Sequence, residues 1–95
     1  MQIVWTETAL RHLAGIKAYI EQDKPEAARN VAQAICTAVA YLAAHLYLGR
    51  SGRKPGTREL IIADTPYLVP YQVQGDPLTI LAVLHGAQQR GEFPD

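Results

Sequence analysis

The first half of the chain has the apolar spacing of two amphipathic helices. Residues 10–20 place a leucine or isoleucine at every third or fourth position, and Thr6 precedes them as a helix N-cap. A second apolar stripe begins at Ala28 and continues to Leu48, where Gly49 is a stop signal. Because only the short segment EQDKPEAA separates the stripes, the pattern predicts a helical hairpin.

The second half changes to the period of two that is typical of strands. Residues 58, 60 and 62 point to one face and residues 59, 61 and 63 to the other, and the run YLVPYQVQ repeats this alternation. Gly75-Asp76 has the form of a tight hairpin turn. The run LTILAVLH is apolar on both faces, which indicates a central strand. The short run QIVW at residues 2–5 adds a strand at the start.

This segregated order of helices and strands predicts an α+β fold in a single domain over residues 1–95. We expect the helical hairpin to cover one face of a mostly antiparallel sheet, made of a three-stranded meander and the N-terminal strand. The other face is then partly exposed, with Arg58 near one end and His85 near another. Pro70 has no N–H for a sheet ladder, so its strand is either an edge there or carries a bulge.

The composition is that of a folded protein in a reducing compartment. Hydrophobic residues make up 48% of the chain and charged residues 19%, which is typical of globular proteins. The start, MQIVWTETAL, lacks the basic region of a secretory signal, and no apolar run is long enough to span a membrane. We therefore expect a cytoplasmic protein without membrane association. Its single cysteine, Cys36, is expected to be a small buried hydrophobic residue.

The stretch GRSGRKPGTREL, residues 49–60, concentrates positive charge. Nine Lys and Arg balance nine Asp and Glu over the whole chain, yet four of these cations stand within nine residues: Arg50, Arg53, Lys54 and Arg58. One interpretation is a solvated connector whose glycines satisfy turn geometry. The other is a local anion-binding surface, since guanidinium groups bind phosphate and carboxylate and glycines allow close approach to the backbone. The spacing does not match a phosphate-binding P-loop.

His85 ends the last predicted strand and is placed where a group could transfer protons. A hydrogen-bonded strand-end residue is the alternative interpretation. His12 and His45 lie on predicted helices without a partner at metal-ligand spacing, and no nucleophile motif such as GxSxG is present. The sequence therefore predicts neither a metal nor another cofactor.

Four pieces of the chain resemble the RelE/ParE family of toxins from type II toxin–antitoxin modules. They are IVWTETALRHLAGIKAYIEQDKPEAA, GRSGRKPGTREL, PYLVPYQVQGD and ILAVLHGAQQR, and they follow the family's order over nearly the whole chain. The resemblance implies the α+β sandwich predicted above. It also implies a hetero-oligomer with a cognate antitoxin, whose C-terminal segment wraps and neutralises the toxin. Five residues of the helical hairpin are the candidate antitoxin contacts: Leu13, Lys17, Ile20, Val31 and Ile35.

The family divides by target. RelE-type members are ribosome-dependent mRNA endonucleases that use no metal, whereas ParE-type members act on DNA gyrase. This chain departs from the ribonuclease pattern: Leu68 stands where those members typically carry an Arg, and Gln88 stands where another often follows the final strand. The last ten residues also lack the Tyr or His that many ribonuclease members carry. We therefore favour a gyrase poison that is not an enzyme.

Two alternatives to the gyrase poison stay open. One is a ribosome-dependent mRNA endonuclease, which would draw its catalytic groups from Arg58, His85 and Arg90. The other is a degenerate toxin that acts only as an antitoxin-binding module. In each case the surface for a target or a phosphate is predicted to comprise six residues: Arg50, Arg53, Lys54, Arg58, His85 and Arg90.

Overall fold

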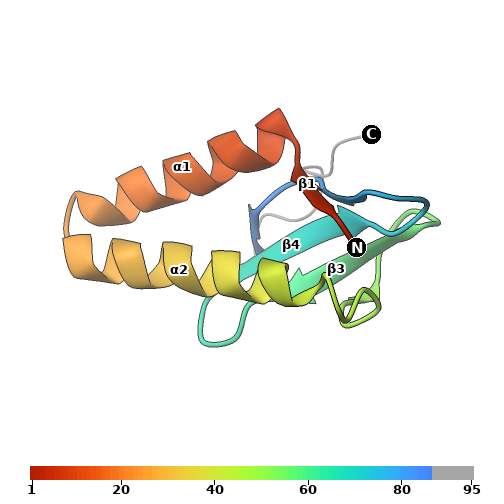
Figure 1. Cartoon of the computed structure of the whole chain (residues 1–95). Helices are drawn as coiled ribbons and strands as arrows, with labels where there is room; N and C mark the ends of the chain where they lie inside the picture. Colours follow the sequence, from red (N-terminus) through yellow and green to blue (C-terminus); the bar gives the residue numbers. More distant parts are fainter. Residues whose placement is uncertain (87–95) are drawn as a thin grey trace.

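A computed structural model describes residues 1–86, which form two helices and a six-stranded sheet. The helices are α1 (Glu7–Glu21) and α2 (Pro25–Tyr41). The strands are β1 (Ile3–Trp5), β2 (Arg50–Ser51), β3 (Thr57–Ile61), β4 (Tyr67–Gln72), β5 (Leu78–Ile80) and β6 (Leu84–His85). Figure 1 shows the two helices side by side, with the connection between them at the end away from β1. The predicted α+β class and the helical hairpin are confirmed.

The sheet is mixed rather than a simple meander. Its strand order is β1-β5-β4-β3-β2, and β6 also pairs with β4. β1 runs parallel to β5, while the remaining pairs are antiparallel. Among residues 1–86, the strands at the two ends of this order are β1 and the two-residue β2, and β2 lies in the basic stretch that the sequence predicts to be a loop.

The alternation along β3 and β4 places one face of the sheet against the helices, as predicted. The core between them consists of buried residues from both layers: Ala9, Ile35, Val39, Leu42, Leu60, Ile62, Val69, Tyr71, Leu78, Ile80 and Val83. A smaller buried cluster of Leu68, Ala82 and Leu84 forms separately. Because neighbouring strand residues point to opposite faces, Leu68 lies on the face of the sheet away from the helices. We call this the rear face.

The predicted last strand is divided into β5 and β6, with residues 81–83 between them. The N-cap of α1 and one residue within α1 hydrogen-bond to the backbone of residues 81–83. Thr6 Oγ1 donates to the Leu81 carbonyl at 3.2 Å, and His12 Nδ1 accepts from the Val83 N–H at 3.2 Å. Thr6 also caps α1, because its hydroxyl accepts from the Ala9 N–H, as the sequence predicts for an N-cap.

Pro70 accounts for the interruption. The Leu81 N–H donates to the Pro70 carbonyl at 2.9 Å. Because the N–H and C=O of one strand residue point to the same side, the missing donor of Pro70 faces residues 81–83. Pro70 lies in a central strand whose pairing with β3 is unbroken. The irregularity is in its other partner, where residues 81–83 face only residues 69 and 70, so Pro70 is neither on an edge strand nor in a strand that itself carries the bulge.

Two boundaries differ from the sequence prediction. Helix α2 ends at Tyr41 instead of Leu48, and residues 42–48 form tight turns in which Ala43, Ala44 and His45 donate three residues back. The sequence has no Gly or Pro before Gly49 to mark this end, so tertiary contacts override the helical pattern. The connection from β4 to β5 spans residues 73–77 rather than a two-residue turn, with Gly75 at a φ of 78°.

Cys36 is exposed, contrary to the prediction that it is buried. Ile35 and Val39 lie four positions apart on α2 and point into the core, so the intervening Cys36 falls to the side of the buried stripe. Within residues 1–86, no helix is long and apolar enough to cross a membrane.

Candidate functional site

Arg50 forms an ion pair with a buried acid. Its Nε and Nη2 donate to Glu59 Oε1 at 3.1 and 2.9 Å, and Glu59 is only 4% exposed. The two residues lie opposite each other in the pairing of β2 with β3. A buried carboxylate without a partner is strongly destabilising, so Arg50 supports the fold by neutralising Glu59.

Arg58 holds the segment that joins α2 to β2. Its Nη1 donates to the Gly49 carbonyl at 2.6 Å and to the Tyr47 carbonyl at 3.4 Å, and its guanidinium carbon lies 4.9 Å from the centre of the Tyr47 ring. Arg58 is opposite Tyr71 in the sheet register, and therefore lies on the same face as the helices. The prediction that it lies on the exposed face is wrong, because the carbonyls that it binds stand on the helix side.

Tyr71 hydrogen-bonds to the same segment between α2 and β2. Its hydroxyl donates to the Leu46 carbonyl at 2.9 Å and accepts from the Gly49 N–H at 2.8 Å. Burial raises the pKa of Tyr71, while the hydrogen bond from Gly49 and the positive charge of Arg58 act in the opposite direction. A Cβ atom at Gly49 would lie 2.7 Å from the Glu59 carbonyl and 2.8 Å from the Tyr71 ring, so only glycine fits.

Arg53 and Lys54 lie at the exposed tip of the loop between β2 and β3. The tip is closed by hydrogen bonds from the Gly52 N–H to the Thr57 carbonyl and from the Thr57 N–H to the Lys54 carbonyl, at 2.9 and 3.1 Å. A hollow of about 460 Å³ beside it is lined by Tyr47, Ser51, Gly52, Arg53, Lys54, Pro55, Gly56, Thr57, Arg58 and Val73. We call this the cationic hollow. It brings together three of the four predicted cations.

His85 lies elsewhere. It pairs with Tyr67 in the register of β4 and β6, and the two rings meet edge to face with centres 5.7 Å apart. Tyr67 and Tyr71 are four residues apart on β4, which corresponds to about 13 Å along the strand. His85 and Arg58 therefore stand at opposite ends of the strand, and the structure does not bring them together. His85 shares the helix side of the sheet with Tyr67, so the prediction that it lies on the exposed face is wrong. Arg90 lies outside the described residues.

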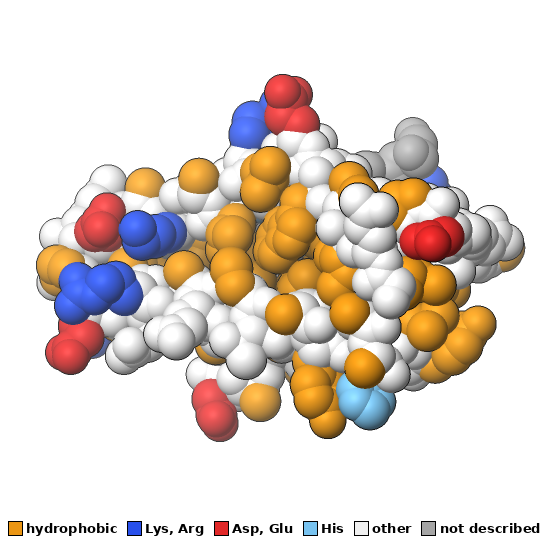
Figure 2. All heavy atoms as spheres, viewed as in Figure 1, with side chains coloured by type: hydrophobic (Ala, Val, Ile, Leu, Met, Phe, Trp, Pro, Cys, Tyr) orange, Lys and Arg blue, Asp and Glu red, His pale blue; other side chains and the backbone are white. Residues whose placement is uncertain are grey.

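An apolar groove runs along the other edge of the sheet. It has a volume of about 500 Å³ and is lined by Met1, Ile3, Trp5, Leu10, Leu13, Cys36, Val39, Ala40 and Ala43, from β1, both helices and the turns after α2. Figure 2 shows hydrophobic side chains gathered between α1 and α2 and toward β1 on this face. Leu10 is 52% exposed, so apolar surface is accessible there.

Of the five predicted antitoxin contacts, Leu13 lines this apolar groove. Lys17 is exposed on α1, and Ile20 and Val31 are half-buried nearer the connection between the helices. Ile35 is completely buried in the core, so it does not contribute to the surface. Helical periodicity alone did not separate the stripe that faces the sheet from the stripe that lines the groove.

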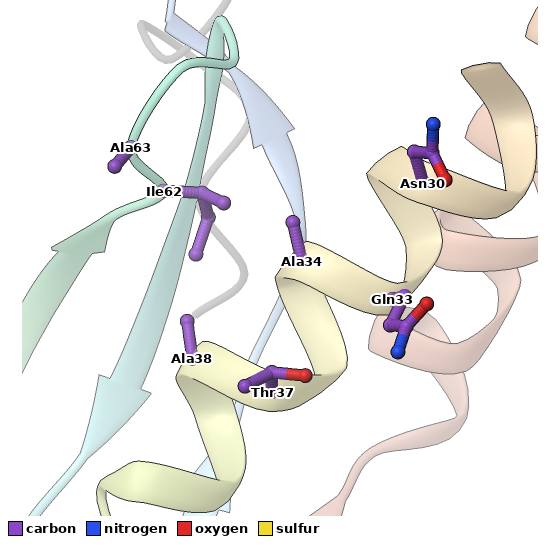
Figure 3. Close-up of a pocket in the computed structure, with 7 residues that line it drawn as sticks. All are labelled: Asn30, Gln33, Ala34, Thr37, Ala38, Ile62 and Ala63. Carbon is purple, nitrogen blue, oxygen red and sulfur yellow. The ribbon is translucent and has the colours of Figure 1, made fainter.

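A third hollow lies between α2 and the β3–β4 turn (Figure 3). It has a volume of about 420 Å³ and is lined by Asn30, Gln33, Ala34, Thr37, Ala38, Ile62 and Ala63. Ala34 and Ala38 project from α2 toward Ile62, while Gln33 extends away from the sheet. This hollow is lined by amide, hydroxyl and apolar side chains and by no ionisable one, so it offers less for chemistry than the cationic hollow.

A family model and two known proteins are similar to this chain over most of its length. The family model described as "ParE toxin of type II toxin-antitoxin system, parDE" matches residues 3–90. The putative toxin Y4kP of Sinorhizobium fredii is 50% identical over 88 residues, which cover 93% of this chain and 91% of that protein. Toxin RelE2 of Caulobacter vibrioides is 36% identical over 87 residues, with 92% and 97% covered.

A solved structure shows the same architecture. A chain of the chromosomal ParDE TA system from P. aeruginosa has a TM-score of 0.80 and 30% sequence identity, with 90% of this chain and 95% of that chain covered. The helical hairpin packed on a mixed sheet is therefore the fold that this chain shares with that structure. The chain belongs to the ParE toxin family of type II toxin–antitoxin systems.

Proposed function

We propose that this toxin arrests growth by binding and poisoning DNA gyrase, and that a cognate antitoxin neutralises it through the apolar groove. The observation that carries the choice of target is the composition of the rear face. There, Leu68 takes the position at which ribonuclease members carry an Arg. It is 3% exposed and belongs to an apolar cluster with Ala82 and Leu84.

Phosphoryl chemistry on mRNA would need a different surface. Attack by a ribose 2′-hydroxyl requires cations around the phosphate and groups that move two protons. The neighbouring strand instead places Glu59 and Ile61 on the rear face, opposite Pro70 and Leu68. Arg58 and His85 both lie on the helix side of the sheet, about 13 Å apart along β4, so neither is on the rear face. These features favour a toxin that acts by binding a protein.

The antitoxin half of the proposal is supported by the apolar groove and by the edge strand beside it. Val4 is exposed on β1, and among residues 1–86 β1 has a neighbouring strand on one side only. Helices that lie in apolar grooves and strands that add to sheet edges are the two common ways in which a protein captures a peptide segment. The solved relative comes from a ParDE system. A complex should bury more than about 1,000 Å², the usual minimum for a specific interface.

Growth-arrested cells provide the first test. On induction, a gyrase poison should cause filamentation and a DNA-damage response while bulk translation continues. His85→Ala should leave the arrest unchanged at equal protein level, because no proton moves on the toxin. A stop in translation within minutes, together with a large loss of toxicity in the His85 variant, would identify a ribonuclease instead. Absence of any arrest at full expression would identify a degenerate toxin.

A further inference from the structure

The cationic hollow combines an immobilised guanidinium group with exposed apolar surface. Both hydrogen bonds of Arg58 use Nη1, and within residues 1–86 its Nε and Nη2 donate to no other group. Two backbone carbonyls and the Tyr47 ring fix the plane of this guanidinium. Since a positioned guanidinium loses little conformational entropy on binding, the free edge of Arg58 is preorganised for a carboxylate.

Three aromatic or aliphatic side chains line the hollow: Tyr47, Pro55 and Val73. Tyr47 is 64% exposed, and the adjacent Leu48 is also exposed. Tyr41 stacks on His45 with ring centres 4.3 Å apart in the turns that lead to Tyr47. Tyrosine and arginine are the residues that most often dominate the binding energy of protein interfaces. Their combination here indicates a protein-binding surface.

Charge favours an acidic partner. Four of the chain's nine Lys and Arg fall in residues 50–58, and no Asp or Glu occurs between Pro25 and Arg58 other than Glu26. Arg50 pairs with Glu59, whereas Arg53, Lys54 and Arg58 line one hollow. The chain as a whole is formally neutral, so its field is local and suits a discrete acidic side chain better than a long polyanion.

We propose that the cationic hollow is the surface with which the toxin binds gyrase, and that it receives an Asp or Glu side chain of that protein. This inference rests on the proposed function. The hollow lies at the β2 edge of the sheet and the apolar groove at the β1 edge. The two surfaces thus separate the target from the antitoxin.

Direct binding of purified toxin to immobilised gyrase, measured at several salt concentrations, tests this inference. The double charge reversal Arg53→Glu with Lys54→Glu should weaken binding by about tenfold or more and flatten its salt dependence, since charges at the rim of an interface act through long-range attraction. Tyr47→Ala should weaken binding by a similar factor, and Tyr47→Phe, which keeps the ring over Arg58, should bind as the wild type does. Arg29→Glu, an exposed charge reversal on α2, is the matched control and should have no effect.

Each outcome decides between the possible occupants. If the wild type binds gyrase and the double reversal binds equally well, the hollow is not the contact, although the proposed function stands. If the wild type does not bind gyrase, both proposals fail. If the reversal instead abolishes binding to a DNA duplex without gyrase, the hollow is a nucleic-acid site. A loss of antitoxin affinity alone would assign the hollow to the antitoxin. Equal melting temperatures of the variants exclude misfolding.

Discussion

The apolar groove and the cationic hollow lie at opposite edges of one sheet and are built in different ways. The groove collects side chains from β1, α1 and α2, whose positions follow from helical and strand periodicity. The hollow depends on a short segment, residues 42–49, that is held by Tyr71 and Arg58 through its carbonyls and one N–H. Periodicity in a sequence therefore reveals the first surface more readily than the second.

The basic stretch contains a second, smaller contrast. Arg50 and Arg58 are separated by only seven residues from each other, and Arg53 and Lys54 lie between them. The outer pair binds a buried carboxylate and backbone carbonyls. The inner pair lies at an exposed loop tip. Clustered charge in a sequence thus combines residues that stabilise the fold from within the sheet with residues whose side chains are exposed at a loop tip.

Among these variants, Gly49→Ala should destabilise the protein most, because it disturbs the segment on which the cationic hollow depends. The new Cβ atom would collide with the Glu59 carbonyl and the Tyr71 ring, and the Tyr71 hydrogen bond would be lost. We expect a loss of about 3 kcal/mol in the free energy of unfolding, the upper range for overpacking. Urea denaturation measures it. A loss below about 0.5 kcal/mol, the usual range for an ordinary surface site, would contradict the role given to Tyr71 and Gly49.

Arg50→Ala should destabilise the protein far more than Lys54→Ala. The first change leaves the Glu59 carboxylate buried without its partner, which we expect to cost about 2 kcal/mol, less than for a fully buried pair because Arg50 is half exposed. The second change removes an exposed cation and should cost less than about 0.5 kcal/mol. Thermal denaturation of the two variants side by side gives the difference. Equal melting temperatures would mean that the ion pair does not stabilise the fold.

Much of the fold followed from the sequence, because its helices and strands alternate with clear periods. The two stripes of α1 and α2 and the two faces of β3 and β4 were predicted correctly. The sequence did not predict three features: the end of α2, the strand β2, and the division of the last strand into β5 and β6. Each depends on a contact between residues distant in the sequence: Tyr71 with Leu46, Arg50 with Glu59, and His12 with Val83.

The candidate site was predicted only in outline for the same reason. The cluster of cations was visible, but nothing in the sequence distinguished Arg58, fixed on the helix side, from Lys54 at the loop tip. Tyr47 belongs to no motif, and only the structure shows that its ring lies against the guanidinium group of Arg58. One signal was present in the sequence: Tyr41 and Tyr47 come shortly before Gly49, where a helix is expected to end. This spacing could have indicated an exposed aromatic surface.

Leu10→Glu should weaken antitoxin binding without affecting gyrase binding, if the two partners use different surfaces. A charge in the apolar groove should weaken antitoxin binding by about 1.5 kcal/mol or more, as is typical of an interface contact that matters, and should leave gyrase binding unchanged. Tyr19→Glu is the control, since Tyr19 is 75% exposed on the same helix and does not line the groove. Titration calorimetry with the purified antitoxin measures both. If both variants bind antitoxin normally, the groove is not its site.

Alkaline pH should loosen the hollow through Tyr71. Because its folded-state pKa is raised above the ordinary value near 10, the folded protein keeps the phenolic proton when the unfolded chain has lost it. The contribution of Tyr71 to stability is therefore complete below about pH 10 and falls above it, by at most about 1.4 kcal/mol per pH unit. Tyr71→Phe should remove this slope, whereas Tyr41→Phe should retain it. Identical alkaline profiles for all three proteins would refute the effect.

The most direct test of the central claim uses purified components. The toxin is added in one assay to gyrase and relaxed plasmid, and in a second to ribosomes programmed with mRNA. We predict that it inhibits supercoiling or traps cleaved DNA, that antitoxin abolishes this effect, and that the mRNA stays intact. Codon-spaced cleavage of the mRNA, with gyrase unaffected at the same toxin concentration, would contradict the assignment of gyrase as the target.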